Sequence, residues 1–295
     1  MLLKYTDYIK GLIITSTGVL VLTPDALVIR LIEAPRPTLI FWRGLLLSIS
    51  LTIFFLIRHR ANALGVLRQI GIPGLLCSLC FCGSTILFVT SITLTAAANT
   101  LVILSIAPLF AAVLSHFFLA ETAPLRTWMT ILVCFVGILS IFAGNLGSGA
   151  LLGDLCAVGA AIFLASYFVI VRHARAVNMV PALIISGLMV AILVSPFAHP
   201  LSIGMRDFTL LLILGCGILP LSFALMTIGP RYLPAPEVGL ILLLETVLGP
   251  VWVWFGLGEI PDSATVIGGI AIVSALGIHL LLGYRASSLE QNLVD

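Results

Sequence analysis

The chain has 295 residues, of which 61% are hydrophobic and only 9% are charged, and its formal net charge is +2. A soluble domain carries about 25% charged residues, so this composition excludes a soluble globular protein, and no basic patch or acidic tail indicates a nucleic-acid partner. Uncharged stretches of about 20 residues recur along the whole chain, which predicts an all-α polytopic membrane protein.

In chain order, hydropathy windows of about 19 residues predict ten transmembrane helices. Their approximate ranges are 11–31, 38–57, 70–91, 95–118, 125–144, 151–171, 180–198, 207–228, 236–257 and 262–283. The loops between them are short and rich in Pro, Gly and charge. The first range follows Lys4 and Lys10 but lacks a small-x-small cleavage site at the right place. We therefore expect it to be the first transmembrane helix, not a removed signal peptide.

The distribution of Lys and Arg predicts the orientation in the membrane. With an even number of spans both termini lie on one side, which would hold ten of the 14 Lys and Arg residues. Lys and Arg concentrate in cytoplasmic loops, so we expect both termini in the cytoplasm. The protein would then be a multi-pass protein of the plasma membrane, with the bacterial inner membrane as the favoured location.

The cysteines and the known catalytic motifs give no sign of a metal or cofactor. All six cysteines lie in apolar runs, and Cys77-x-x-Cys80-x-Cys82 has no His or carboxylate beside it. Free cysteine packs as a small hydrophobe. The chain also lacks the phosphate-binding loop G-x-x-x-x-G-K-[ST], so we expect neither a cofactor nor a bound metal.

The sequence contains two similar halves. The segment "GLIITSTGVLVLTPDALVIR" from Gly11 and the segment "GDLCAVGAAIFLASYFVIVR" from Gly153 align at an offset of 142 residues. The endings "FLAE" at Glu121 and "GLGE" at Glu259 align at an offset of 138. Each half holds five predicted spans, an odd number, so the second half would cross the bilayer in the opposite sense. Inverted repeats of this kind, here 1–147 and 148–295, are typical of transporters.

The chain resembles the EamA repeat of the drug/metabolite transporter superfamily. The resemblance rests on the two aligned segments, on Arg43 in "FWRGLL" and on the endings "FLAE" and "GLGE". The resemblance covers nearly the whole chain. It implies ten helices, cytoplasmic termini and a substrate cavity between the halves. Members of that family move amino acids, nucleotide-linked metabolites and other small polar organic molecules, often outward. They usually have proline after the mid-helix Glu of helix 9, where this chain has Thr246, although Pro250 could supply a kink a turn later.

Glu245 lies near the middle of the predicted ninth helix, in "LILLLETVLGP". An ionised side chain at mid-membrane costs at least about 2.5–3.5 kcal/mol, so Glu245 should face a cavity or a partner. Helical spacing puts Glu237, Glu245, Gly249 and Trp252 on one face, which could line a water-filled path. The alternative for Glu245 is a protonated acid bonded to a neighbouring helix. Glu237 either faces the cavity or favours the helix N-terminus from its first turn.

Asp25 directly follows Thr23-Pro24 in the outer part of the first helix. Pro24 leaves the carbonyl of Leu20 without its helical partner, which predicts a bend at the level of a carboxylate. Such a bend is tolerated in a bilayer only beside protein or water. Arg43, behind Trp42, could pair with Asp25 across helices or hold an anionic group of the substrate, and the sequence favours neither over the other.

The repeat adds two more candidates. Tyr167 matches Asp25 in the first alignment, and Asn99 matches Glu237 in the second. The candidate residues for a substrate cavity are therefore Glu245, Asp25, Trp252, Tyr167, Arg43, Asn99, Glu237 and Trp42.

Together these features predict a secondary or facilitative transporter, an exporter or exchanger of small polar metabolites such as amino acids. It would alternate access around a cavity lined by helices 1, 4, 6 and 9, with protons as a candidate coupling ion. The sequence leaves the oligomeric state open. The alternative is an intramembrane enzyme that acts on a lipid or a lipid-linked group, with Glu245 or His116 as the acid or base.

Overall fold

The computed structural model describes residues 2–60, 63–95, 97–120 and 151–258, with scattered positions in 125–136 and 267–282. The side chains of 2–6, 59, 63, 64, 98 and 99 are outside this description. The described residues form helices joined by short turns, and eight of these helical stretches are long and apolar enough to cross a membrane. The predicted spans 125–144 and 262–283 lie mostly outside the described residues.

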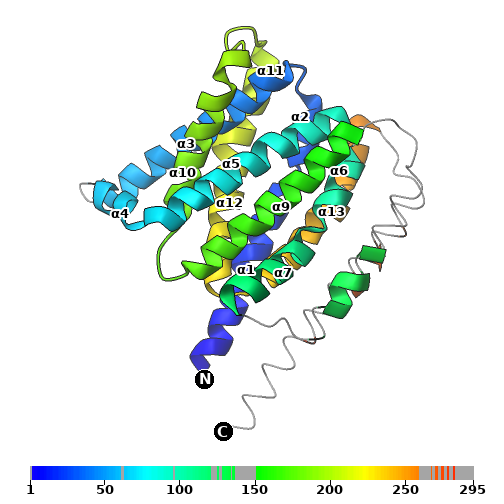
Figure 1. Ribbon diagram of the computed structural model, residues 1–295. Helices are drawn as coiled ribbons and strands as arrows, with labels where there is room; N and C mark the ends of the chain where they lie inside the picture. Colours follow the sequence, from blue (N-terminus) through cyan, green and yellow to red (C-terminus); the bar gives the residue numbers. More distant parts are fainter. Residues whose placement is uncertain are drawn as a thin grey trace.

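Apart from the interval between α7 and α9, the described helices follow one another along the chain with short connections (Figure 1). They are α1 (Leu2–Leu22), α2 (Asp25–Leu31), α3 (Arg36–His59), α4 (Ala63–Gln69), α5 (Gly71–Leu94), α6 (Ala97–Leu104), α7 (Ala107–Leu119), α9 (Leu151–His173), α10 (Val180–Val194), α11 (Met205–Leu212), α12 (Leu219–Ile228) and α13 (Ala235–Leu257). Two 3₁₀ turns, η2 (Ser195–Phe197) and η4 (Gly229–Arg231), and one π turn, η3 (Ile213–Ile218), complete the set.

Several spans are interrupted where the sequence contains proline. The expected bend in the first span is a break between α1 and α2 at Thr23–Pro24. The expected fourth and eighth spans each correspond to one membrane-length helical stretch, Thr100–Leu119 and Met205–Arg231, with a local irregularity inside it. The fourth divides into α6 and α7 just before Pro108, and the eighth contains η3 just before Pro220. Proline removes a helical hydrogen bond and crowds the preceding turn, so each break lies within two residues of a proline.

Side-chain hydroxyl groups accompany two of these breaks. The hydroxyl of Thr23 donates to the carbonyl of Leu20 over 2.9 Å, and this is the carbonyl that Pro24 deprives of its N–H. The hydroxyl of Ser105 donates to the carbonyl of Val102 in the last turn of α6. Backbone groups freed inside a membrane must find such partners, so each break is bonded within the protein.

Helices of the first half pack along helices of the second. The most extensive contacts join α5 to α9, α3 to α10 and α1 to α12, and Figure 1 shows the first two pairs side by side. Gly153, in the first turn of α9, lies against Leu94 at the end of α5, whereas Gly11 of α1 lies against Leu233 just before α13. The other end of α9 reaches this second region, where Arg172 bonds to the carbonyl of Pro230. Thus α1 and α9 run in opposite directions, as the sequence repeat predicts.

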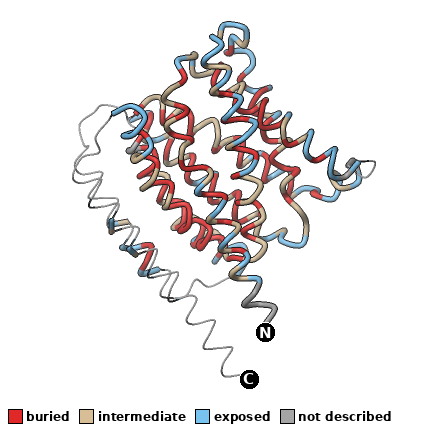
Figure 2. The backbone as a smooth tube through the Cα atoms, turned by 180° about the vertical axis from the view of Figure 1, so that it is seen from behind, coloured by how far each residue is buried: buried red, intermediate tan, exposed pale blue. Residues whose placement is uncertain are grey.

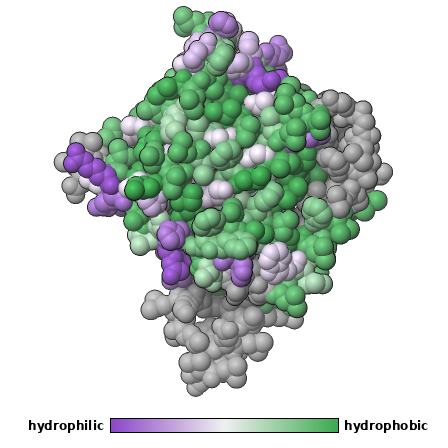
Figure 3. Space-filling model, viewed as in Figure 1, coloured by the Kyte–Doolittle hydropathy of each residue, from purple (hydrophilic) through white to green (hydrophobic). Residues whose placement is uncertain are grey.

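The surface and the interior have the character expected of a protein in lipid. Buried residues fill the middle of the helix bundle (Figure 2), while large side chains such as Phe54, Phe117 and Phe255 are exposed. Figure 3 shows a broad hydrophobic face, with hydrophilic residues gathered toward its edges. Apolar surface of this extent is covered by lipid in membrane proteins. The chain is therefore a multi-pass integral membrane protein.

Candidate functional site

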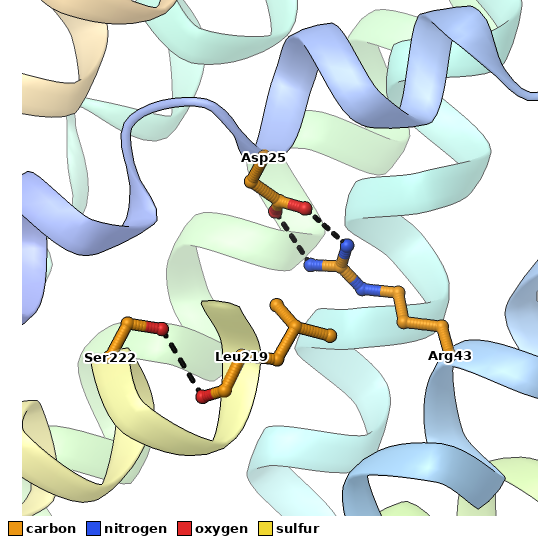
Figure 4. Close-up of polar contacts among 4 residues, drawn as sticks. All are labelled: Asp25, Arg43, Leu219 and Ser222. Carbon is orange, nitrogen blue, oxygen red and sulfur yellow. Dashed lines mark hydrogen bonds and ion pairs between the residues drawn. The ribbon is translucent and has the colours of Figure 1, made fainter. Parts of the chain in front are cut away.

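A buried ion pair lies where α1 gives way to α2. Asp25 is the first residue of α2, and Arg43 reaches it from the second turn of α3 (Figure 4). The two side chains are 2% and 4% exposed. Arg43 Nη2 donates to Asp25 Oδ2 over 2.6 Å, and Nη1 donates to Oδ1. Of the two roles that the sequence left open for Arg43, this structure therefore shows the pairing across helices, in the bidentate form that a guanidinium favours.

Asp25, Arg43 and Glu245 line one cavity between the two halves of the chain. Its remaining walls include the rings of Phe81, Phe88 and Phe223 and several aliphatic side chains. The guanidinium of Arg43 lies 5.8 Å from the centre of the Phe88 ring. The cavity has a volume of about 30 Å³, which is room for one or two water molecules. Two carboxyl groups and one guanidinium thus meet in a small pocket with mostly apolar walls.

Glu245 differs from Asp25 in its bonding. Its side chain is buried in the middle of α13 and interacts electrostatically with both Asp25 and Arg43. Among the described residues it has no hydrogen-bond or ion-pair partner. A buried carboxyl group without such partners is costly when ionised, which makes Glu245 the group in this cavity with capacity to bind something further.

Three aromatic candidates lie around the cavity but not in its lining. Tyr167 is fully buried behind Phe81, with ring centres 5.2 Å apart, and its hydroxyl bonds to that of Thr227. Trp252 donates its indole N–H to Thr23 over 2.9 Å. Trp42 donates its indole N–H to the carbonyl of Pro200 over 3.1 Å. The polar groups of these three side chains therefore bond to other protein groups outside the cavity lining.

The remaining candidates lie elsewhere on the helices. Glu237 is buried in the first turn of α13, away from the cavity lining. Asn99 lies on α6, and its side chain is outside the described part of the chain. The helix face that joins Glu237 to Glu245 is also used for packing, because a Cβ added to Gly249 would lie 2.5 Å from Leu101 Cδ1. At this position the glycine makes room for a neighbouring helix, not for water.

Sequence reasoning missed several residues of the cavity wall. Phe81, Thr85 and Phe88 come from α5, and Phe223 comes from α12, whereas we expected helices 1, 4, 6 and 9 to form the lining. In an apolar helix, phenylalanine and threonine carry no sign of which side faces a cavity. Only the packing of α5 and α12 against the charged helices identifies them.

Comparison with known proteins gives the family. The model of the EamA-like transporter family matches this chain twice, at residues 10–143 and 151–281. The chain belongs to the EamA-like transporter family. This confirms the resemblance seen in the sequence, and each match falls in one of its two similar halves. The protein is therefore related to membrane transporters over nearly its whole length.

Two further similarities place this EamA-like transporter among known proteins. It is 27% identical over 184 residues to the pseudopaline exporter CntI of Pseudomonas aeruginosa (strain UCBPP-PA14). The alignment covers 60% of this chain and 64% of that exporter, less than two thirds of its length. A protein of known crystal structure superimposes with a TM-score of 0.77 at 19% identity, covering 93% of this chain and 98% of the other. The second similarity supports the fold.

Proposed function

We propose that this protein is an exporter or exchanger of small polar organic metabolites, such as amino acids, that alternates access around the cavity at Asp25, Arg43 and Glu245. The family and the exporter among its relatives support a transport function. The observation that carries the proposal is the buried group of two acids and one guanidinium at the contact between the halves. Ionisable residues inside a membrane are expensive and mark substrate and ion pathways.

Counting charges in the cavity indicates what it would bind. Asp25 and Arg43 neutralise each other, so an ionised Glu245 leaves one negative charge uncompensated. Either a proton or a cationic group of the substrate supplies the missing positive charge. The ammonium group of an amino acid would lie near Glu245, and its carboxylate would find in Arg43 a planar bidentate donor. The phenyl rings offer apolar contact and faces for a cation.

The cavity must enlarge before it can hold an organic substrate. Its volume of about 30 Å³ is far below the roughly 300–1,000 Å³ of ordinary ligand pockets. Leu22 and Asp25, which flank the break between α1 and α2, and Leu104, at the end of α6, all line it. We infer that these breaks are the hinges at which helices separate, since hinge residues lie at the ends of rigid elements.

Other features of the proposal come from the sequence. The Lys and Arg bias supports cytoplasmic termini and a plasma-membrane location, and the offset alignment supports repeats divided near residue 148. The alternative function, an intramembrane enzyme for a lipid or lipid-linked group, would use Glu245 or His116 as acid or base. His116 is exposed in the last turn of α7 and is not part of the cavity lining. The family and the named exporter favour transport.

Substrate release by a Glu245 variant tests the proposal. The purified protein is reconstituted into liposomes loaded with a mixture of isotope-labelled amino acids, and their release is measured. We expect saturable release from wild-type vesicles and a loss of about tenfold or more in Glu245→Gln, the effect of one charged interaction. Glu33→Gln is the matched control, because the Glu33 side chain is 81% exposed.

The outcomes separate the alternatives. Wild-type release from Glu245→Gln vesicles would remove Glu245 from the mechanism. No release of any amino acid by the wild-type protein would reject this class of substrate. Conversion of a labelled lipid by the detergent-solubilised protein would support the enzyme instead.

A further inference from the structure

A second, smaller cavity adjoins the central one behind Arg43. It lies between α3, α5, α10 and α12 and has a volume of about 10 Å³. The two cavities share Arg43, Thr85 and the rings of Phe81 and Phe223 in their linings. Ser186 of α10 lines only the second cavity. Arg43 is therefore a common wall between the substrate cavity and a small space in the contact of the two halves.

Two residues of this lining each carry a buried polar atom that has no hydrogen-bond partner among the described residues. Arg43 gives both Nη groups to Asp25, while its Nε is buried without a hydrogen bond to any described residue. Ser186 is fully buried, and its hydroxyl has no partner among the described residues. The hydroxyl of Ser222 on α12 bonds to the carbonyl of Leu219 over 3.2 Å (Figure 4), so it does not serve Arg43. Buried polar groups nearly always have partners.

The backbone around this cavity is tightly packed. Gly44 and Gly187, the residues that follow Arg43 and Ser186, meet at the crossing of α3 and α10, where a Cβ added to Gly187 would lie 2.6 Å from the carbonyl oxygen of Gly44. Small residues at such a crossing let the two helix backbones approach closely. The space behind Arg43 therefore lies beside a close contact between the halves.

We propose that one water molecule occupies the second cavity, accepts a hydrogen bond from Arg43 Nε–H and bonds to the hydroxyl of Ser186. A volume of about 10 Å³ meets the minimum of roughly 10–15 Å³ that a single buried water needs. A buried water makes about three hydrogen bonds, and Thr85 in the same lining offers another hydroxyl. Ser186 is then a positioning residue that holds the Arg43 guanidinium from behind through this water.

This assignment deepens the proposed function, on which its mechanistic consequence rests. The proposed water ties Arg43 Nε to Ser186 beside the close crossing of α3 and α10, whereas Asp25 begins the short helix that follows the break at Pro24. When the ion pair opens, Asp25 moves away with α2, and Arg43 stays in place with both Nη groups free for a substrate carboxylate.

A matched pair of variants tests the water site. Ser186→Thr keeps the hydroxyl, while Ser186→Val has nearly the same shape without it. In high-resolution maps we expect a water peak about 2.7–3.2 Å from Arg43 Nε and Oγ of residue 186 in the wild-type protein and in Ser186→Thr. The peak should be lost in Ser186→Val. A wild-type map without a peak, or a peak that persists unchanged in Ser186→Val, would overturn the assignment.

A double-mutant cycle separates positioning from packing. Arg43→Lys removes Nε–H, so Ser186→Val should lower the melting temperature relative to Ser186→Thr in the wild-type background but not in the Arg43→Lys background. An equal loss in both backgrounds would show that Ser186 only packs. Should Arg43→Lys not fold, the maps decide. Neither measurement depends on transport. A lack of amino-acid release would therefore reject the proposed substrate and leave the assignment of the water site unchanged.

Discussion

At the scale of single residues, the charges of the cavity are the most consequential feature. Asp25 and Arg43 are both buried and each satisfies the other, so their energetic roles cannot be separated. A second ion pair, between Arg206 and Glu33, joins the two halves at the surface over 3.2 Å with both side chains mostly exposed. The two pairs have the same chemistry in opposite surroundings, which makes one the control for the other.

Asp25→Asn should destabilise the protein by about 3–5 kcal/mol, because it leaves the charge of Arg43 buried without compensation. Chemical unfolding in detergent measures this difference in the free energy of unfolding. Glu33→Gln, which breaks the exposed pair, should cost less than about 1 kcal/mol. Equal effects of the two substitutions would show that the Asp25 site is solvated, contrary to its burial.

The sequence identified the charged residues of the site because charge is rare in this chain and expensive in lipid. It could not identify Phe81, Thr85 or Phe223, since side chains of these types occur throughout the apolar helices. It also proposed Trp42 and Trp252 for the cavity, and the described bonds of these two are with Pro200 and Thr23. Which neighbour an indole meets depends on helix rotation and packing, which a periodic pattern does not specify.

At the scale of helices, prolines inside membrane-spanning segments differ in whether they interrupt the helix. The helix is interrupted at Pro24, as its sequence predicts, yet α13 continues through Pro250 from Ala235 to Leu257. Pro108 lies at the turn between α6 and α7 and packs against Gly239 of α13. Neighbouring helices decide whether a proline in a membrane helix breaks it. Span positions are therefore predictable from hydropathy, and their interruptions are only partly so.

Thr23→Val tests how the first break is held. The Thr23 hydroxyl donates to the Leu20 carbonyl and accepts from the Trp252 indole, so its loss leaves polar groups without partners and should cost about 1–3 kcal/mol. Thermal unfolding compares it with Thr52→Val. Thr52 bonds to a carbonyl inside the uninterrupted helix α3, and its replacement should change stability by less than about 0.5 kcal/mol. A smaller loss for Thr23 than for Thr52 would contradict this account.

At the scale of the whole molecule, the sequence predicted the helical class, the family and the opposite directions of α1 and α9. Hydropathy indicated the class, and the segments that the two halves share indicated the family. The orientation in the membrane is a prediction from the distribution of Lys and Arg.

Cysteine labelling tests that orientation. In a background without the native cysteines, Arg175→Cys places a thiol at an exposed position between α9 and α10. Leu201→Cys places one at an exposed position between α10 and α11. A membrane-impermeant maleimide should label Leu201→Cys in intact cells and Arg175→Cys only after permeabilisation. The reverse pattern would invert the topology, and labelling of both from one side would remove a span between them.

The charges of the cavity do not obey the symmetry of the helices that carry them. By the sequence alignment, the counterparts of Asp25 and Glu245 are Tyr167 and Ala107, which bear no charge. Two mirrored arrangements of the helices would consequently expose these charges to unequal environments and differ in energy. A carrier that works as proposed above would rest mainly in one orientation, and the rate constants of its inward-to-outward and outward-to-inward transitions would differ even without a gradient.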